Sequence, residues 1–92
     1  MRLIWSPRSE SELAAIIDYI AVDNLDAALE LDFHITSSAE RLMGFPKLGK
    51  PGRVEGTREL IVHAHYILVY EIDGEELLVL SVLHTSRQWP PE

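Results

Sequence analysis

Apolar side chains recur every three or four residues in the first half of the chain, the spacing of one buried helix face. The first such stretch follows Ser6 and Pro7, a typical helix start, because serine caps free N–H groups and proline lacks one. The second follows the cap residue Asn24 and ends near Gly44. The two stripes are Leu13, Ile16, Ile17 and Ile20, and Ala28, Leu31, Ile35, Ala39 and Leu42. Because a short turn joins them, they predict an antiparallel helical hairpin.

Shorter apolar runs typical of β-strands make up most of the remaining sequence. One run covers residues 2–5, and three more cover residues 57–62, 66–72 and 77–84. The run at 66–72 is almost entirely apolar, as expected for a central strand covered on both faces. Asp73 and Gly74 form a strong hairpin signal between the last two runs. The predicted order is β-α-α-β-β-β, an α+β fold in which the helical hairpin packs on one face of a small, mainly antiparallel sheet.

Size and composition limit what such a chain does. With 92 residues there is no room for a deep internal pocket, so chemistry belongs on an open face or in a shallow groove. No apolar run approaches the roughly 18 residues that span a bilayer, and the first apolar segment is too short for a signal peptide. There is no cysteine. We therefore expect a single domain over residues 1–92, located in the cytoplasm and not in a membrane.

Positive charge gathers in and just after a loop that joins the helices to the strands. Residues 44–56 are rich in glycine and proline, which interrupt helices and strands. The basic residues of this region are Lys47, Lys50, Arg53 and Arg58. The protein as a whole has a formal net charge of −7, which makes it a poor non-specific binder of phosphate backbones. We therefore expect no direct DNA binding by this chain alone.

Several short motifs follow one another in a characteristic order. They are Trp-Ser-Pro at 5–7, Asp-Tyr-Ile-Ala-x-Asp-Asn at 18–24, Arg-Leu-x-x-Phe-Pro-x-Leu-Gly-Lys-Pro-Gly-Arg-Val-x-Gly-Thr-Arg-Glu-Leu at 41–60, Tyr-Ile-Leu-Val-Tyr at 66–70 and Val-Leu-His-x-x-Arg-x-Trp-Pro at 82–90. Together they resemble the ParE/RelE superfamily, the toxins of bacterial type II toxin–antitoxin modules. The resemblance implies the β-α-α-β-β-β fold and a cognate antitoxin protein that neutralises the toxin.

The resemblance also implies one of two activities. ParE-like members inhibit DNA gyrase, whereas RelE-like members enter the ribosome and cleave mRNA. Ribonuclease chemistry needs an acid, a base and cations that stabilise charge on the phosphate. RelE-like toxins typically carry a basic residue in the strand motif Tyr-Arg-Leu-Val-Tyr, at the position that Ile67 occupies here. The remaining candidates for a ribonuclease site are Arg53, Arg58, His84 and Arg87.

The sequence favours a gyrase inhibitor without catalytic residues. Ile67 cannot stabilise an oxyanion, the acidic net charge opposes docking to ribosomal RNA, and the motif at 51–60 is closer to ParE-like members. The residues expected to contact the target are Lys47, Lys50, Arg53, Arg58, Arg87 and Trp89. A ribosome-dependent endoribonuclease acting on mRNA is the alternative, and a degenerate toxin that only binds its antitoxin is another.

Each candidate also has a plain structural interpretation. Arg58 is able simply to pair with a neighbouring carboxylate, and His84 to be an ordinary surface histidine at a strand end. Trp89 is large enough to close one end of the core. His63 and His65 have the spacing that places both on one strand face, but without a third ligand in view we expect no metal site. No cofactor is expected.

Overall fold

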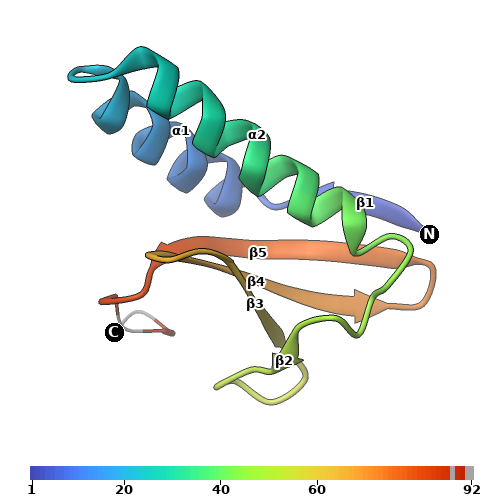
Figure 1. Ribbon diagram of the computed structural model, residues 1–92. Helices are drawn as coiled ribbons and strands as arrows, with labels where there is room; N and C mark the ends of the chain where they lie inside the picture. The colour runs from blue at the N-terminus through green and yellow to red at the C-terminus, as the bar shows by residue number, and fades with distance from the viewer. Residues whose placement is uncertain (88, 91–92) are drawn as a thin grey trace.

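The computed structural model describes residues 1–87 and 89–90, which form two helices and one five-stranded sheet. The elements are β1 (Arg2–Trp5), α1 (Pro7–Ala21), α2 (Leu25–Arg41), β2 (Lys50–Pro51), β3 (Arg58–His63), β4 (Tyr66–Asp73) and β5 (Glu76–His84). The strand order is β1-β5-β4-β3-β2, with β1 parallel to β5 and every other pair antiparallel. Figure 1 shows the two helices as an antiparallel pair over one face of the sheet. The predicted α+β fold is confirmed.

Both helices begin at the predicted cap residues. The Ser6 hydroxyl accepts a hydrogen bond from the Ser9 N–H at 3.1 Å, and the Asn24 side chain accepts one from the Ala27 N–H at 3.0 Å. These bonds satisfy backbone donors that have no partner within the first helical turn. The closed end of the hairpin projects past the ends of the strands (Figure 1). No helix in the described part of the chain is both long enough and apolar enough to cross a bilayer.

The main core lies between α2 and the sheet. The predicted stripe of α2 is buried, with Ile35 at 0% exposure, and it packs against Leu68, Tyr70 and Val79 of the sheet. The predicted stripe of α1 packs on the same cluster but is only half-buried. The α2 stripe therefore contributes most of the apolar area that the helices bury, and burial of apolar area stabilises the fold.

A second, smaller apolar cluster covers the opposite face of the sheet. It consists of Ile67, Val69 and Leu83, with Leu80 and Trp89 packed against it. β4 is thus covered on both faces, as its apolar run predicted. Trp89 belongs to this second cluster and does not close the end of the main core.

Several features of the strands were not predicted. Lys50 and Pro51 pair with β3 opposite Glu59 and Arg58, which adds a fifth strand inside the glycine-rich loop. A two-residue strand that contains proline has no periodic signal of its own, and proline is tolerated there because β2 is an edge strand. In addition, the register between β4 and β5 shifts at Val69, which marks a β-bulge.

Replacing Ile35 with alanine should destabilise the fold by about 2–4 kcal/mol, because the side chain is fully buried and its removal leaves a cavity. Ile61 provides a matched control, since it is 65% exposed on β3. The same Ile61→Ala change should cost less than about 1 kcal/mol. Urea denaturation followed by circular dichroism measures both. Similar losses for the two variants would contradict the assignment of the core.

Candidate functional site

The loop between α2 and β3 is fastened to the sheet by two side chains. The hydroxyl of the fully buried Tyr70 donates to the Pro46 carbonyl at 2.6 Å and accepts from the Gly49 N–H at 2.9 Å. The Arg58 guanidinium donates to the Gly49 carbonyl at 2.7 and 3.0 Å and to the Lys47 carbonyl at 3.2 Å. These contacts fix the loop backbone on which the predicted cationic site is built.

Close approach of the loop to the sheet requires glycine at position 49. A Cβ atom added to Gly49 would lie 2.8 Å from the Glu59 carbonyl oxygen and 2.8 Å from the Tyr70 hydroxyl. Neither neighbour has room to move, because Tyr70 is fully buried and the Glu59 carbonyl belongs to a strand. Packing therefore explains the glycine at position 49, and an unusual backbone conformation is not needed.

Arg53 neutralises a buried carboxylate. Glu59 is only 3% exposed, and its side chain accepts the Arg53 backbone N–H at 2.8 Å and the Arg53 guanidinium at 3.2 Å. The structural interpretation of the sequence had an arginine pairing with a carboxylate, but it assigned that role to Arg58. Arg58 instead binds backbone carbonyls. The sequence could not show this, because the burial of Glu59 depends on where the loop folds back over β3.

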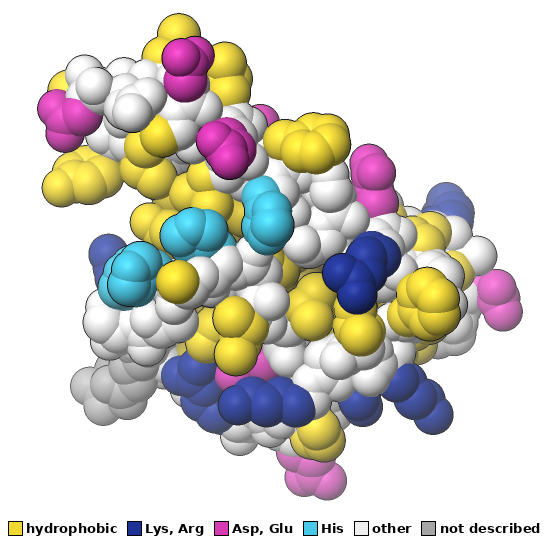
Figure 2. Space-filling view, viewed as in Figure 1, with side chains coloured by type: hydrophobic (Ala, Val, Ile, Leu, Met, Phe, Trp, Pro, Cys, Tyr) yellow, Lys and Arg dark blue, Asp and Glu magenta, His cyan; other side chains and the backbone are white. Residues whose placement is uncertain are grey.

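Lys47 and Lys50 present exposed side chains on this fastened loop. No salt bridge within the described residues involves either lysine. In Figure 2 the visible basic side chains lie over the sheet and loop portion of the molecule and not on the projecting end of the helical hairpin. The four predicted cations of the loop region therefore divide into two exposed lysines and two arginines whose side chains bind Glu59 and loop carbonyls.

The other predicted site residues lie at the opposite end of the sheet. Arg58 is opposite Tyr70 in the strand register, whereas His84 is opposite Tyr66, and four residues correspond to about 13 Å along a strand. Arg87 and Trp89 follow His84 and line a groove of about 610 Å³ between α1 and the end of β5. The structure therefore does not bring the predicted site residues together in one place.

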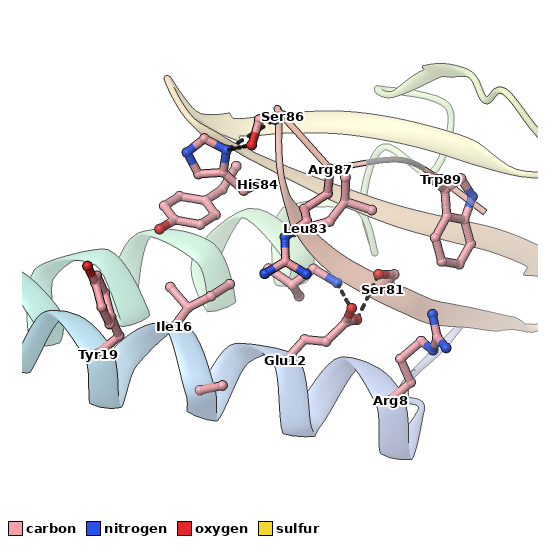
Figure 3. Close-up of a pocket in the computed structure, with 13 residues that line it drawn as sticks. Arg8, Glu12, Ile16, Tyr19, Ser81, Leu83, His84, Ser86, Arg87 and Trp89 are labelled. Atoms are coloured by element: carbon pink, nitrogen blue, oxygen red, sulfur yellow. Dashed lines mark hydrogen bonds between the residues drawn. The ribbon is translucent and has the colours of Figure 1, made fainter. Parts of the chain in front are cut away.

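In the groove between α1 and β5, Glu12 and Ser81 lie near the centre, Arg8 and Trp89 at one end and Tyr19 at the other (Figure 3). The Glu12 carboxylate accepts the Ser81 hydroxyl at 2.7 Å and the Val82 N–H at 3.2 Å. Arg8 points from α1 toward Trp89, with its guanidinium carbon 5.9 Å from the ring centroid. Sequence reasoning singled out neither Glu12 nor Arg8, because their partners are about 70 and about 80 residues away in the chain.

His84 is held by local contacts at the rim of the groove. Its Nδ1 accepts the Ser86 N–H at 3.1 Å and lies 2.8 Å from the Ser86 hydroxyl. Since Nδ1 accepts from a backbone donor, the neutral ring carries its proton on Nε2. A general acid or base at this position would therefore have to act through Nε2.

The four histidines of the chain form one continuous group of rings, part of which is visible in cyan in Figure 2. The centroid distances are 6.5 Å for His34–His63, 6.1 Å for His63–His65 and 5.6 Å for His65–His84. Within residues 1–87 and 89–90, no three His, Cys, Asp or Glu side chains are arranged to hold a metal ion. The sequence revealed only the pair at 63 and 65, because His34 and His84 come from distant segments.

Two helices packed on one face of a five-stranded mixed sheet are also the fold of ParE/RelE-like structural neighbours. The family model for the ParE toxin of the type II toxin–antitoxin system parDE matches residues 3–89. The chain therefore belongs to the ParE toxin family of type II toxin–antitoxin systems.

Individual relatives agree with this assignment. The chain is 36% identical to Y4kP, a candidate toxin of Sinorhizobium fredii, over 97% of this chain and 93% of the relative. It is 26% identical to the toxin RelE2 of Caulobacter vibrioides, over 94% of this chain and 97% of the relative. In a structure of the chromosomal ParDE system of P. aeruginosa, one chain has the same fold, with a TM-score of 0.81 at 24% identity, over 91% of this chain and 95% of that one.

Replacing Arg53 with glutamine should destabilise the protein by about 2 kcal/mol, because it leaves the Glu59 carboxylate buried without its charged partner. Lys50→Gln removes the same charge from an exposed side chain and should cost less than about 0.5 kcal/mol. Chemical denaturation of the two variants makes the comparison. A loss for Lys50→Gln as large as that for Arg53→Gln would contradict the structural role given to Arg53.

Proposed function

We propose that this ParE-family toxin inhibits DNA gyrase in the bacterial cytoplasm and has no nuclease activity. The observation that carries the proposal is the apolar packing around Ile67, which is only 8% exposed. On the neighbouring strands Ile67 is paired with Ile61 and Leu83, and it belongs to the apolar cluster with Val69. A phosphodiester-cleaving site needs cations where negative charge develops. An isoleucine flanked by two further aliphatic residues supplies none.

The arrangement of the alternative catalytic residues supports the same proposal. Arg53 is engaged by Glu59, and Arg58 by loop carbonyls at one end of the sheet. His84 and Arg87 are at the other end. General acid–base catalysis requires groups within hydrogen-bonding reach of the same substrate atoms. The two arginines at one end of the sheet and the His84–Arg87 pair at the other are too far apart to meet that requirement.

For the contact with gyrase we propose a main role for Lys47 and Lys50. They are exposed on a loop whose backbone is already fixed by Tyr70 and Arg58, so little conformational freedom is lost when they bind a partner. Arg53 and Arg58 act by holding this loop in place. Arg87 and Trp89 provide a separate contact at the far end of the sheet.

The Lys47→Glu/Lys50→Glu variant should require at least about tenfold more toxin for half-inhibition of supercoiling by purified gyrase, because it reverses the charge of the contact. Arg41→Glu is the matched control, since it reverses an exposed charge at the end of α2, outside the loop. It should change inhibition by less than about threefold. Equal effects of the two variants, or no inhibition by the wild-type protein, would overturn the proposal.

The ribonuclease is the second candidate function, favoured only by the presence of His84 and Arg87 at one end of the groove. Primer extension on a reporter mRNA in a translating extract tests it. Our proposal predicts no ribosome-dependent cuts. Such cuts, reduced about a hundredfold by His84→Ala or Arg87→Ala while gyrase activity stays normal, would establish the ribonuclease instead. Inactivity in both assays would indicate a degenerate toxin that only binds its antitoxin.

A further inference from the structure

An apolar hollow lies beside the exposed lysines of the loop between α2 and β2. Its volume is about 590 Å³, and the residues that line it are Met1, Phe45, Pro46, Lys47, Leu48 and Ile72. Phe45 and Leu48 are 65% and 42% exposed. Single apolar side chains are ordinary on a protein surface, but these two line one hollow together, which is typical of an interaction site.

The backbone that carries Phe45 and Leu48 is fixed before any partner binds. The Leu48 N–H donates to the Phe45 carbonyl at 3.0 Å and closes a turn. The Tyr70 hydroxyl donates to the Pro46 carbonyl at 2.6 Å and accepts the Gly49 N–H at 2.9 Å. Side chains on such a backbone lose little conformational freedom on binding, so the hollow is prepared to receive a partner.

The loop around the hollow is basic, although the protein as a whole is acidic. Residues 44–54 contain Lys47, Lys50 and Arg53 and no acidic residue, whereas the whole chain has a formal net charge of −7. Arg53 pairs with the buried Glu59, so the two lysines provide the exposed charge. In Figure 2, hydrophobic side chains lie beside basic ones over the sheet and loop portion of the molecule. The hollow therefore combines an apolar surface with positive charge.

Charge decides between an acidic partner and a second copy of this chain. Two copies joined through their hollows would bring Lys47 and Lys50 of both together, and like charges across an interface are unfavourable. A partner with carboxylates around an apolar side chain is instead attracted by the same lysines.

We propose that the hollow receives a large apolar side chain of gyrase, on a segment where acidic residues flank that side chain and face Lys47 and Lys50. Exposed ion pairs add little affinity because water and salt screen them, whereas large apolar side chains in a pocket dominate the energy of an interface. The hollow therefore supplies affinity, and the lysines supply orientation and a faster encounter. This docking mode rests on the proposed function, because gyrase is the partner in both.

Two matched double variants test the hollow in the supercoiling assay with purified gyrase. Phe45→Ala/Leu48→Ala removes two side chains of the hollow and should require at least about 30-fold more toxin for half-inhibition. Leu29→Ala/Phe33→Ala removes the same two types of side chain from α2, where they are 56% and 73% exposed. This control should change inhibition less than about threefold. Equal effects of the two variants, or wild-type inhibition by the hollow variant, would overturn the docking mode.

All four of these side chains are exposed, so both variants should fold, which circular dichroism checks. Binding rates, measured by surface plasmon resonance on immobilised gyrase, give a readout that a merely structural role would not move. Phe45→Ala should speed dissociation at least about tenfold. Lys47→Gln/Lys50→Gln should instead slow association and reduce its dependence on salt. Wild-type dissociation of the Phe45→Ala variant would contradict the role of the hollow.

The outcomes separate this docking mode from the proposed function. If the wild type inhibits gyrase and Lys47→Glu/Lys50→Glu weakens inhibition, but Phe45→Ala/Leu48→Ala does not, the docking mode fails and the proposed function stands. If the wild type does not inhibit gyrase, both fail. Light scattering after size-exclusion chromatography tests the second copy: a wild-type dimer that Phe45→Ala/Leu48→Ala disperses would assign the hollow to self-association and overturn the docking mode.

Discussion

The buried hydroxyl of Tyr70 is the interaction on which the rest of the structure depends. The ring belongs to the main core beneath α2, and the hydroxyl holds the loop at Pro46 and Gly49. A buried hydroxyl is costly without partners, so the core and the loop have to form together. The loop then places Arg53 over the Glu59 carboxylate on the other face of the sheet. Tyr70 thereby links the core on one face of the sheet to the loop that carries the exposed lysines, and this loop in turn covers Glu59 on the other face.

The sequence predicted most of the fold because the apolar periodicity is strong. Ser6 and Asn24 begin the helices as predicted, and the α2 stripe around Ile35 is buried as its spacing requires. The spacing could not reveal that β1 joins the sheet beside β5, since a parallel pairing with a distant strand has no local signal. Nor could it reveal β2, which exists only because the anchored loop runs along β3.

The candidate site was predicted as a list of charged residues, and the structure gives those residues different roles. A sequence shows that Arg53 and Arg58 are cations but not that their donors are occupied by Glu59 and by backbone carbonyls. Conversely, the exposed apolar residues Leu25, Leu29 and Phe33 of α2 were missed because they alternate with the buried stripe of the same helix. Exposed leucine and phenylalanine look like core residues until the packing of α2 is known.

The carboxylate of Glu12 has a consequence for how these molecules behave in solution. β1 reaches only as far as Val79, so the last residues of β5 would present an open row of backbone groups. Such an edge is a template on which another chain adds a strand. Glu12 occupies the Val82 N–H and introduces a negative charge directly beside the edge. A neighbouring strand would have to displace that charge and remove it from water, so α1 protects the sheet against growing from molecule to molecule.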